Sequence, residues 1–343
     1  MAENIRVGIV GCGMIATKNH LPAFTTVGGF EVTALCDILP ERMAERAESF
    51  ELENATRFTD CNALFASGLV DAVAICTPND LHCPQTIAAC EAGLHVLCEK
   101  PMAGSLEEST AMIAAAKAAG VVLQINQSIR YSAPYRSIVD AVESGAIGEV
   151  FHARCIRAGA GTPNKGWSPG ADWFVQKKHE GGLLVDIGIH MADLLRQIMG
   201  DAKTVAGLVD TRLPDIDVPD NINALFRFES GATATLELSW TLPGGAGFLE
   251  IYGTEGRIRM GFNGNAVEMV RIAGGKQVAS TINPAAHCRS QDSFRDAVLG
   301  VGSSLTPGEY GRRALALCLA IEQSSTTGQF VDIAHFEGDN DIC

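Results

Sequence analysis

Three side chains stand where they could move a proton and stabilise a developing charge. Lys100 follows the apolar run 94–98 and precedes Pro101, which cannot continue a central strand, so we expect the lysine at the carboxyl edge of a sheet. Asp186 and His190 are four residues apart, the spacing that places two side chains on one helix face. A histidine transfers protons near neutral pH, and a lysine can stabilise an alkoxide. Together with the dinucleotide turn described below, Lys100 and the Asp186–His190 pair predict hydride transfer at a hydroxyl carbon, with the lysine and the histidine handling charge and proton.

The histidine and aspartate have alternative interpretations. A lone buried histidine is most often a core residue, but here Asp193, three residues after His190, is expected to orient the imidazole. As metal ligands, Asp186 and His190 would supply two donors without an evident third, so we predict no metal site. The glycines Gly181 and Gly182 would let this helix begin close to another stretch of backbone.

A glycine-rich turn follows the first apolar run and opens a helix. Gly11 permits the tight turn, and Gly13 lets the backbone approach a pyrophosphate. The helix that begins at Met14 and Ile15 would direct its N–H groups and positive dipole end at the phosphates. An ordinary strand-to-helix turn is the alternative, but the position within a βαβ unit favours a dinucleotide site.

The nucleotide preference depends on Asp37. It ends the second apolar run, 26 residues after Gly11, where a carboxylate can accept both ribose hydroxyls and would repel a 2′-phosphate. Ile38 next to it offers no donor to a phosphate. We therefore predict NAD; Arg42, one turn into the following helix, leaves NADP as the alternative. Asp37 could also simply cap that helix.

Other polar residues end neighbouring strands at the same sheet edge, where ligands bind in doubly wound folds. His82 is ambiguous, because it either serves the site or lies in the first turn of a helix. The additional candidates for cofactor contact are Thr77, Pro78, Asn79, His82, Glu99 and Lys100.

Short apolar runs alternate with helical patterns over the first 126 residues, which predicts a doubly wound, Rossmann-type parallel sheet. The runs are 5–10, 31–36, 72–76, 94–98 and 121–126, and the helices are 14–26, 40–49, 82–92 and 105–119. After a helix at 134–143 and a strand at 149–159, β patterns fill 203–280, and several alternate in polarity, which is typical of an antiparallel sheet. We predict domain 1–126 for the cofactor and α+β domain 127–343 for substrate and oligomerisation, allowing the helices near 290–300 and 307–325 to return to the first domain.

Composition limits the function classes. The 343 residues carry a formal net charge of −14, which argues against unaided nucleic-acid binding. No apolar run is long enough to span a membrane, and the first residues lack the layout of a signal peptide. The 11 cysteines lack CxxC pairs and favour reduced thiols in the cytoplasm.

Together these residues resemble the Gfo/Idh/MocA family of sugar and polyol oxidoreductases. The similarity covers nearly the whole chain and includes the segments VGIVGCGMIA, CTPNDLH, AGLHVLCEKPMA, GGLLVDIGIHMADLL and IYGTEGRI. The resemblance implies that Lys100, Asp186 and His190 form the catalytic trio, and that a large open sheet serves dimer or tetramer packing. Arg130 and Tyr131 fit a family segment that contacts substrate, whereas Ser128 and Ile129 depart from it.

The resemblance implies NAD(P)-dependent hydride transfer between nicotinamide and a secondary hydroxyl or carbonyl of a sugar, anhydrosugar or cyclic polyol. His190 would remove the hydroxyl proton while Lys100 stabilises the same oxygen, although the two could exchange roles. Trp167 and Trp173 could stack on a sugar ring or simply anchor their loop. Two alternatives are a sugar–sugar oxidoreductase with tightly bound cofactor and a non-catalytic dinucleotide-binding regulator.

Overall fold

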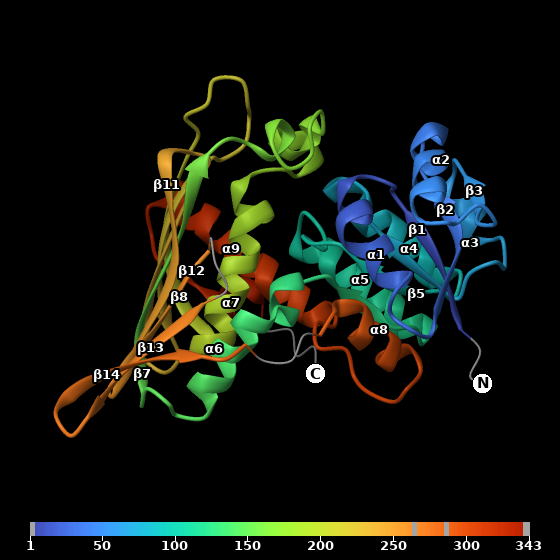
Figure 1. Cartoon of the computed structure of the whole chain (residues 1–343). Coiled ribbons are helices and arrows are strands. Elements are labelled where there is room, and N and C mark those ends of the chain that lie inside the picture. Colours follow the sequence, from blue (N-terminus) through green and yellow to red (C-terminus); the bar gives the residue numbers. More distant parts are fainter. Residues whose placement is uncertain (1–3, 263–265, 285–287, 339–343) are drawn as a thin grey trace. The chain divides into compact units, whose positions relative to one another are not determined.

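Two structural units divide the chain in the computed structural model, which describes residues 4–262, 266–284 and 288–338 (Figure 1). Unit 1 comprises Met1–Gln127 and Arg289–Arg312, and unit 2 comprises Ser128–Cys288 and Arg313–Cys343. The segment 289–312 thus belongs to unit 1 by its contacts; the sequence analysis assigned it to the second domain while allowing its helices to return to the first. Unit 1 is therefore built from two separate stretches of chain.

Unit 1 contains a six-stranded parallel sheet in the order β3-β2-β1-β4-β5-β6. Its strands are β1 (Ile5–Val10), β2 (Phe30–Cys36), β3 (Thr56–Phe58), β4 (Ala72–Ile75), β5 (His95–Cys98) and β6 (Leu123–Ile125). The predicted doubly wound sheet is confirmed. The prediction missed β3, because three largely exposed residues at a sheet edge carry no apolar run.

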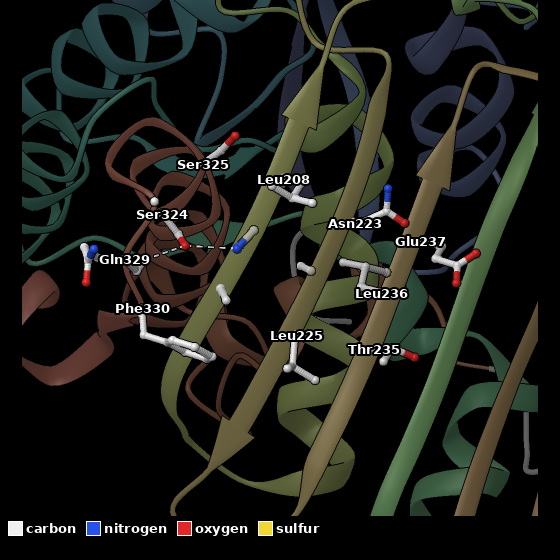
Figure 2. A pocket seen from close by; sticks show the side chains of 14 residues that line it. Leu208, Asn223, Leu225, Thr235, Leu236, Glu237, Ser324, Ser325, Gln329 and Phe330 are labelled. Carbon is white, nitrogen blue, oxygen red and sulfur yellow. Dashed lines mark hydrogen bonds between the residues drawn. The ribbon is translucent and has the colours of Figure 1, made fainter.

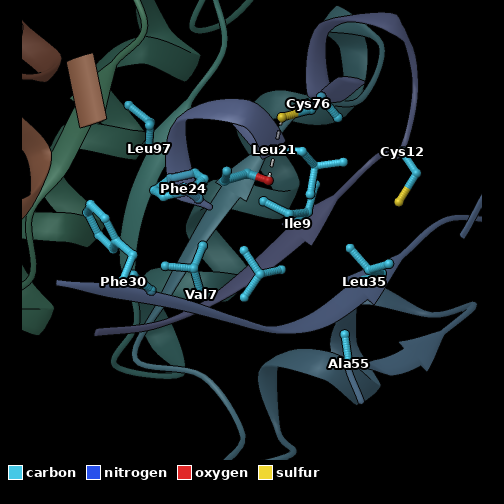
Figure 3. Close-up of a cluster of buried hydrophobic side chains, with 14 of the residues drawn as sticks. Val7, Ile9, Cys12, Leu21, Phe24, Phe30, Leu35, Ala55, Cys76 and Leu97 are labelled. Carbon is cyan, nitrogen blue, oxygen red and sulfur yellow. Dashed lines mark hydrogen bonds between the residues drawn. The ribbon is translucent and has the colours of Figure 1, made fainter. Parts of the chain in front are cut away.

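Helices cover both faces of this sheet. They are α1 (Leu21–Phe24), α2 (Pro40–Ser49), α3 (Cys61–Phe65), α4 (His82–Glu91), α5 (Leu106–Ala119) and α8 (Ser290–Val298). On one face, the β1 side chains Val7 and Ile9 join a buried cluster with Phe24 of α1 (Figure 3). The same cluster contains Met43 of α2 and Phe294 of α8. α8 therefore supplies part of the core of the cofactor domain.

The returning segment also completes strand β6. The Gln124 amide donates to the Ser290 carbonyl and accepts from the Ser304 hydroxyl, both at 2.8 Å. The Ile125 N–H donates to the Thr306 carbonyl at 2.8 Å. The polar groups of a buried edge strand are thus satisfied from the far end of the sequence.

Unit 2 contains a nine-stranded sheet in the order β14-β13-β12-β11-β7-β10-β9-β8-β15. Its strands are β7 (Val150–Ala160), β8 (Ala202–Asp210), β9 (Asn221–Phe228), β10 (Thr233–Ser239), β11 (Thr241–Gly253), β12 (Gly256–Gly261), β13 (Val267–Ala273), β14 (Lys276–Ile282) and β15 (Val331–Asp332). All neighbouring pairs are antiparallel except β7 with β10, so the predicted mostly antiparallel sheet is confirmed. The predicted β region 203–280 includes most of β14 without a separate run for it, and β15 was not predicted.

One face of this second sheet is covered by helices. These are α6 (Ala133–Glu143), α7 (Ile189–Met199) and the C-terminal part of α9 (Gly308–Thr327), while α10 (Ile333–Glu337) follows β15 (Figure 1). On the other face, Leu208 and Leu225 are 72% and 43% exposed. Near the edge, the Ser324 and Ser325 hydroxyls of α9 accept from Gly207 and Val209 of β8. None of the helices formed by the described residues has the length and apolar character needed to cross a membrane.

Candidate active site

The glycine turn after β1 has the space that a pyrophosphate needs. Gly11 adopts a φ of +91°, and a Cβ there would lie 2.7 Å from the Cys76 carbonyl oxygen. A Cβ at Gly13 would meet no atom within 4 Å, so the backbone lies open at this point. The chain is helical from Met14 and Ile15 onward, which supplies N–H groups of a first helical turn. The turn therefore fits a dinucleotide.

Asp37 stands beside this turn in a fixed orientation. One carboxylate oxygen accepts from the Cys12 N–H at 2.8 Å and the other from the Leu39 N–H at 2.9 Å. A carboxylate has lone pairs beyond these two bonds, so it can still accept ribose hydroxyls. Arg42 lies 3.9 Å away and is half exposed. Burial, followed by the charge of Asp37, raises the pKa of Cys12 to about 12, so this thiol remains protonated near neutral pH.

His82 braces two turns at the carboxyl edge of the sheet. Its Nδ1 lies 2.7 Å from the Pro101 carbonyl oxygen, and its Nε2 lies 2.9 Å from that of Thr77. Burial lowers the pKa of His82, although the two carbonyl oxygens act in the opposite direction. Both nitrogens lie against backbone carbonyl oxygens, and a neutral imidazole has one N–H, so the ring donates to one of the two turns and packs against the other.

Around the other predicted contacts, Thr77 donates its hydroxyl to Gln85 at 2.7 Å, and Asn79 after Pro78 is buried. These residues follow β4, next to the Gly11 turn in the order of strands. They therefore lie at the sheet edge where the sequence analysis predicted contacts with the cofactor.

Glu99 lies at the centre of a buried polar network. Its Oε1 accepts from His20 Nε2 at 2.7 Å and from Asn126 Nδ2 at 2.6 Å, and the carboxylate is 6% exposed. The Gln291 amide of α8 lies 3.3 Å from His20 Nδ1. Because that amide also donates to Asn19, we assign Nδ1 as acceptor and Nε2–H as the donor to Glu99.

This network fixes the charge beside Lys100. Burial raises the pKa of Glu99, but the hydrogen bonds from His20 and Asn126 and the charge of Lys100 outweigh it, and the pKa falls below its ordinary value. The Lys100 N–H also donates to Glu99 Oε2 at 3.3 Å. Glu99 therefore stays ionised and holds the backbone that carries the lysine.

His20 reaches Glu99 from an irregular part of the nucleotide helix. The turn Ala16–His20 is π-helical, and the Leu21 N–H bonds to Ala16, five residues back. A second π-helical turn, Leu184–Gly188, contains Asp186 in unit 2. π-helical turns occur frequently at functional sites, and neither turn could be predicted from 3.6-residue periodicity.

Asp186 and His190 lie on consecutive helical segments of unit 2. His190 is in the first turn of α7, directly after the π-helical turn that holds Asp186. The wider turn changes the i, i+4 alignment expected for a regular helix. A Cβ at Gly181 would collide with the backbone carbonyls of Trp173 and Phe174, which confirms the close approach predicted for this glycine.

Asp193 makes a different contact from the one expected. Its carboxylate accepts from Arg130 Nε at 2.6 Å and from Nη2 at 2.8 Å, and both side chains are buried. The aspartate therefore orients Arg130, a contact that the sequence analysis did not predict. The Nε and Nη2 groups of Arg130, a predicted substrate residue, are thus occupied by Asp193. Tyr131 beside it is 2% exposed.

The two predicted substrate tryptophans lie in different surroundings. Trp167 is 51% exposed. Trp173 stacks on Phe174 with ring centroids 3.8 Å apart, so one of its faces is already covered. Trp167 is thus the more accessible aromatic surface in this loop.

Neither a metal cluster nor a groove found in unit 2 coincides with the predicted residues. Among residues 4–262, 266–284 and 288–338, no group of three or more His, Cys, Asp or Glu is arranged to hold a metal ion. A groove of about 380 Å³ lies over β8, β9 and β10 beside the end of α9 (Figure 2). Leu208, Leu225 and Phe330 line it, and it contains no predicted site residue.

Sequence reasoning missed three polar residues near Lys100. Asn126 and Gln127 directly follow β6, so the rule that ligands bind beyond the carboxyl ends of strands could have identified them. His20 carried no such signal, because its partner Glu99 is 79 residues away.

Comparison with known proteins places both units in one family. Residues 5–127 match an oxidoreductase family with an NAD-binding Rossmann fold, and residues 135–259 match the GFO/IDH/MocA C-terminal domain. The chain is 33% identical over 340 residues to a 1,5-anhydro-D-fructose reductase of Ensifer adhaerens, covering 96% of this chain and 98% of that protein.

Solved structures agree with this assignment. An aldose-aldose oxidoreductase from Caulobacter crescentus, complexed with glycerol, is similar with a TM-score of 0.85 and 27% identity, covering 96% of this chain and 100% of that one. Levoglucosan dehydrogenase in complex with NADH and levoglucosan has a TM-score of 0.85 and 26% identity, with coverage of 96% and 100%. The chain therefore belongs to the Gfo/Idh/MocA family of oxidoreductases, and its unit 1 is an NAD-binding Rossmann domain.

Proposed function

We propose that this protein is a dehydrogenase or reductase acting on a secondary hydroxyl or carbonyl of a sugar, anhydrosugar or cyclic polyol. The observation that carries the proposal is the placement of Lys100. It follows β5 at the carboxyl edge of the NAD-binding sheet, beside a Glu99 carboxylate fixed by His20 and Asn126. A positioned cation at this edge suits a substrate oxygen that gains negative charge.

In the proposed reaction His190 transfers the proton and Lys100 stabilises the negative charge. Bound NAD supplies the acceptor or donor of the hydride. His190 takes the proton of the substrate hydroxyl during oxidation and returns it during reduction. Lys100 donates a hydrogen bond to the same oxygen and stabilises the alkoxide charge, while Asp186 orients the substrate or a neighbouring hydroxyl. Lys100 and His190 could exchange the acid and base roles.

The named relatives support the substrate class. One is a 1,5-anhydro-D-fructose reductase, and another is a dehydrogenase solved with NADH and the anhydrosugar levoglucosan. Both act on cyclic carbohydrates by name. The exposed ring of Trp167 offers a surface on which the apolar face of such a ring could stack.

The test is initial-rate reduction of NAD and NADP by the purified protein across cyclic polyols, aldoses, anhydrosugars and sugar phosphates. Lys100→Ala is expected to lower kcat about 10²–10³-fold while NADH binding by calorimetry stays close to wild type. Lys117→Ala, at an exposed lysine in the last turn of α5, is the matched control and should retain full activity. Loss of NADH binding in Lys100→Ala without loss of turnover per bound cofactor would refute the assignment.

A second candidate is oxidation of one sugar coupled to reduction of another on a cofactor that never leaves. The similarity to an aldose-aldose oxidoreductase supports this second candidate. Purified, dialysed protein would then retain nicotinamide absorbance and would oxidise one sugar only when a second is supplied. A protein that binds NADH but turns over no substrate in either assay would instead be a regulator.

We also propose a homodimer or homotetramer in the cytoplasm. The uncovered sheet face of unit 2 exposes the apolar side chains of Leu208 and Leu225 (Figure 2). Buried free thiols such as Cys76 and Cys98 suit a reducing compartment. Light scattering after size exclusion tests the assembly, and a monomer at all concentrations would contradict it.

A further inference from the structure

Two buried amides at the end of β6 have hydrogen-bonding atoms that no group among the described residues satisfies. Gln127 is 1% exposed, and neither its Oε1 nor its Nε2 has a partner. Asn126, also 1% exposed, donates Nδ2 to Glu99, but its Oδ1 has no partner. A buried polar atom without a partner is costly, so the pair points to a group that arrives with a ligand.

The order of strands separates substrate from cofactor at this edge. Asp37 follows β2, the Gly11 turn follows β1, Thr77 follows β4 and Lys100 follows β5. Neighbouring strands are about 4.8 Å apart, so this order runs from the ribose carboxylate toward the reacting end. β6 comes next and is the last strand of the sheet. Gln127 therefore lies one strand beyond Lys100, on the side away from the nucleotide.

The unsatisfied atoms define the chemistry of the missing partner. Gln127 offers one acceptor and an amide donor, and Asn126 offers one acceptor. A hydroxyl donates once and accepts as well, so neighbouring hydroxyls satisfy all three atoms, whereas a carboxylate or phosphate would leave both acceptors without donors. We propose that Gln127, assisted by Asn126 Oδ1, binds a hydroxyl of the substrate next to the reacting carbon and thereby selects polyhydroxylated substrates. This inference rests on the proposed function.

The test compares two glutamines of the same segment. Gln127→Met keeps the side-chain length and removes the unsatisfied amide, whereas the control Gln124→Met removes an amide that binds Ser290 and Ser304. Without substrate, Gln127→Met should melt at the wild-type temperature or higher, and Gln124→Met several degrees lower. With the sugar that the wild type uses best, Gln127→Met should raise KM about 10- to 100-fold and leave the Kd for NADH unchanged.

Each outcome decides a separate point. An unchanged KM would overturn the inference, as would a rise in the NADH Kd that matches the rise in KM, since the amide would then serve the cofactor. Melting of Gln127→Met as low as Gln124→Met would show that the amide is a structural partner, and would also overturn it. If the wild type turns over no sugar or polyol, the proposed function fails; an active wild type with an indifferent Gln127 refutes this inference alone.

Discussion

Replacing His20 by phenylalanine tests how unit 1 holds the carboxylate beside Lys100. The variant keeps an aromatic ring at a fully buried position but removes the Nε2–H that donates to Glu99 at 2.7 Å. Asn126 remains as a donor to the same oxygen. Because the Glu99 side chain is only 7% exposed, water cannot readily replace the lost bond.

The size of the effect follows from the charge on Glu99. A hydrogen bond to a charged group contributes about 1.5–3 kcal/mol to stability. For a unit of about 150 residues, 1 kcal/mol corresponds to about 2–4 °C, so His20→Phe should lower the Tm of unit 1 by about 3–12 °C.

The effect also has a definite pH dependence. The wild-type pKa of Glu99 is lowered in the fold, so its stabilising contribution is present above the ordinary value of 4.5 and lost as the pH falls through the folded value. In His20→Phe, burial raises this pKa with less opposition. The stability cost of the variant should therefore be greatest near neutral pH and shrink on acidification.

Urea denaturation at several values between about pH 3.5 and pH 8, which spans the ordinary pKa of the carboxyl, measures both quantities. His20→Gln is the matched variant, because its amide retains an N–H donor, and it should recover at least half of the loss. Equal stability of the Phe and Gln variants, or a cost that does not change with pH, would refute the view that His20 stabilises an ionised Glu99.

Three further changes follow from contacts described above. Gly11→Ala adds a Cβ 2.7 Å from the Cys76 carbonyl oxygen at a φ of +91°, so calorimetry should show weakened NAD binding; an unchanged Kd would contradict this. Arg130→Met leaves the buried Asp193 carboxylate without its guanidinium partner and should lower the free energy of unfolding, measured in urea, by about 3–5 kcal/mol. The double variant Arg130→Met/Asp193→Leu should recover most of this loss, and no recovery would mean that packing, not charge, dominates. Burial lowers the pKa of His82 below its ordinary 6.5, so below pH 6.5 the imidazole is protonated in the unfolded chain but still neutral in the native protein. The free energy of unfolding therefore decreases as the pH falls below 6.5. His82→Gln should flatten this loss in denaturation curves measured from about pH 5.5 to 7.5, and an unchanged slope would show that His82 does not contribute to it.

The parts of the site that depend on local spacing could be predicted from the sequence. Gly11 and Gly13 lie between a strand and a helix, and Asp37 and Lys100 directly follow apolar runs. In a parallel sheet each of these positions comes to the same edge, so strand assignment alone places the residues. Strand assignment also places Asn126 and Gln127 at this edge, because they follow β6.

The parts that depend on long-range pairing could not be predicted. His20 contacts Glu99 across 79 residues, and Arg130 contacts Asp193 across 63. A carboxylate three residues after a histidine suggested an orienting pair, whereas the bidentate fit of the same carboxylate to the Arg130 guanidinium had no signal in the sequence. The π-helical turn Leu184–Gly188 also altered a helical spacing that a single sequence cannot reveal.

The discontinuous make-up of unit 1 has a consequence for protein synthesis. The partners that satisfy Gln124 and Ile125 lie 166 to 181 residues further along the chain. At about 5–20 residues per second, the ribosome adds them roughly 10–35 s after β6 is made. During that interval the nascent sheet has an unfilled edge and lacks Phe294 from its core. The half of the protein that leaves the ribosome first can therefore finish folding only near the end of translation.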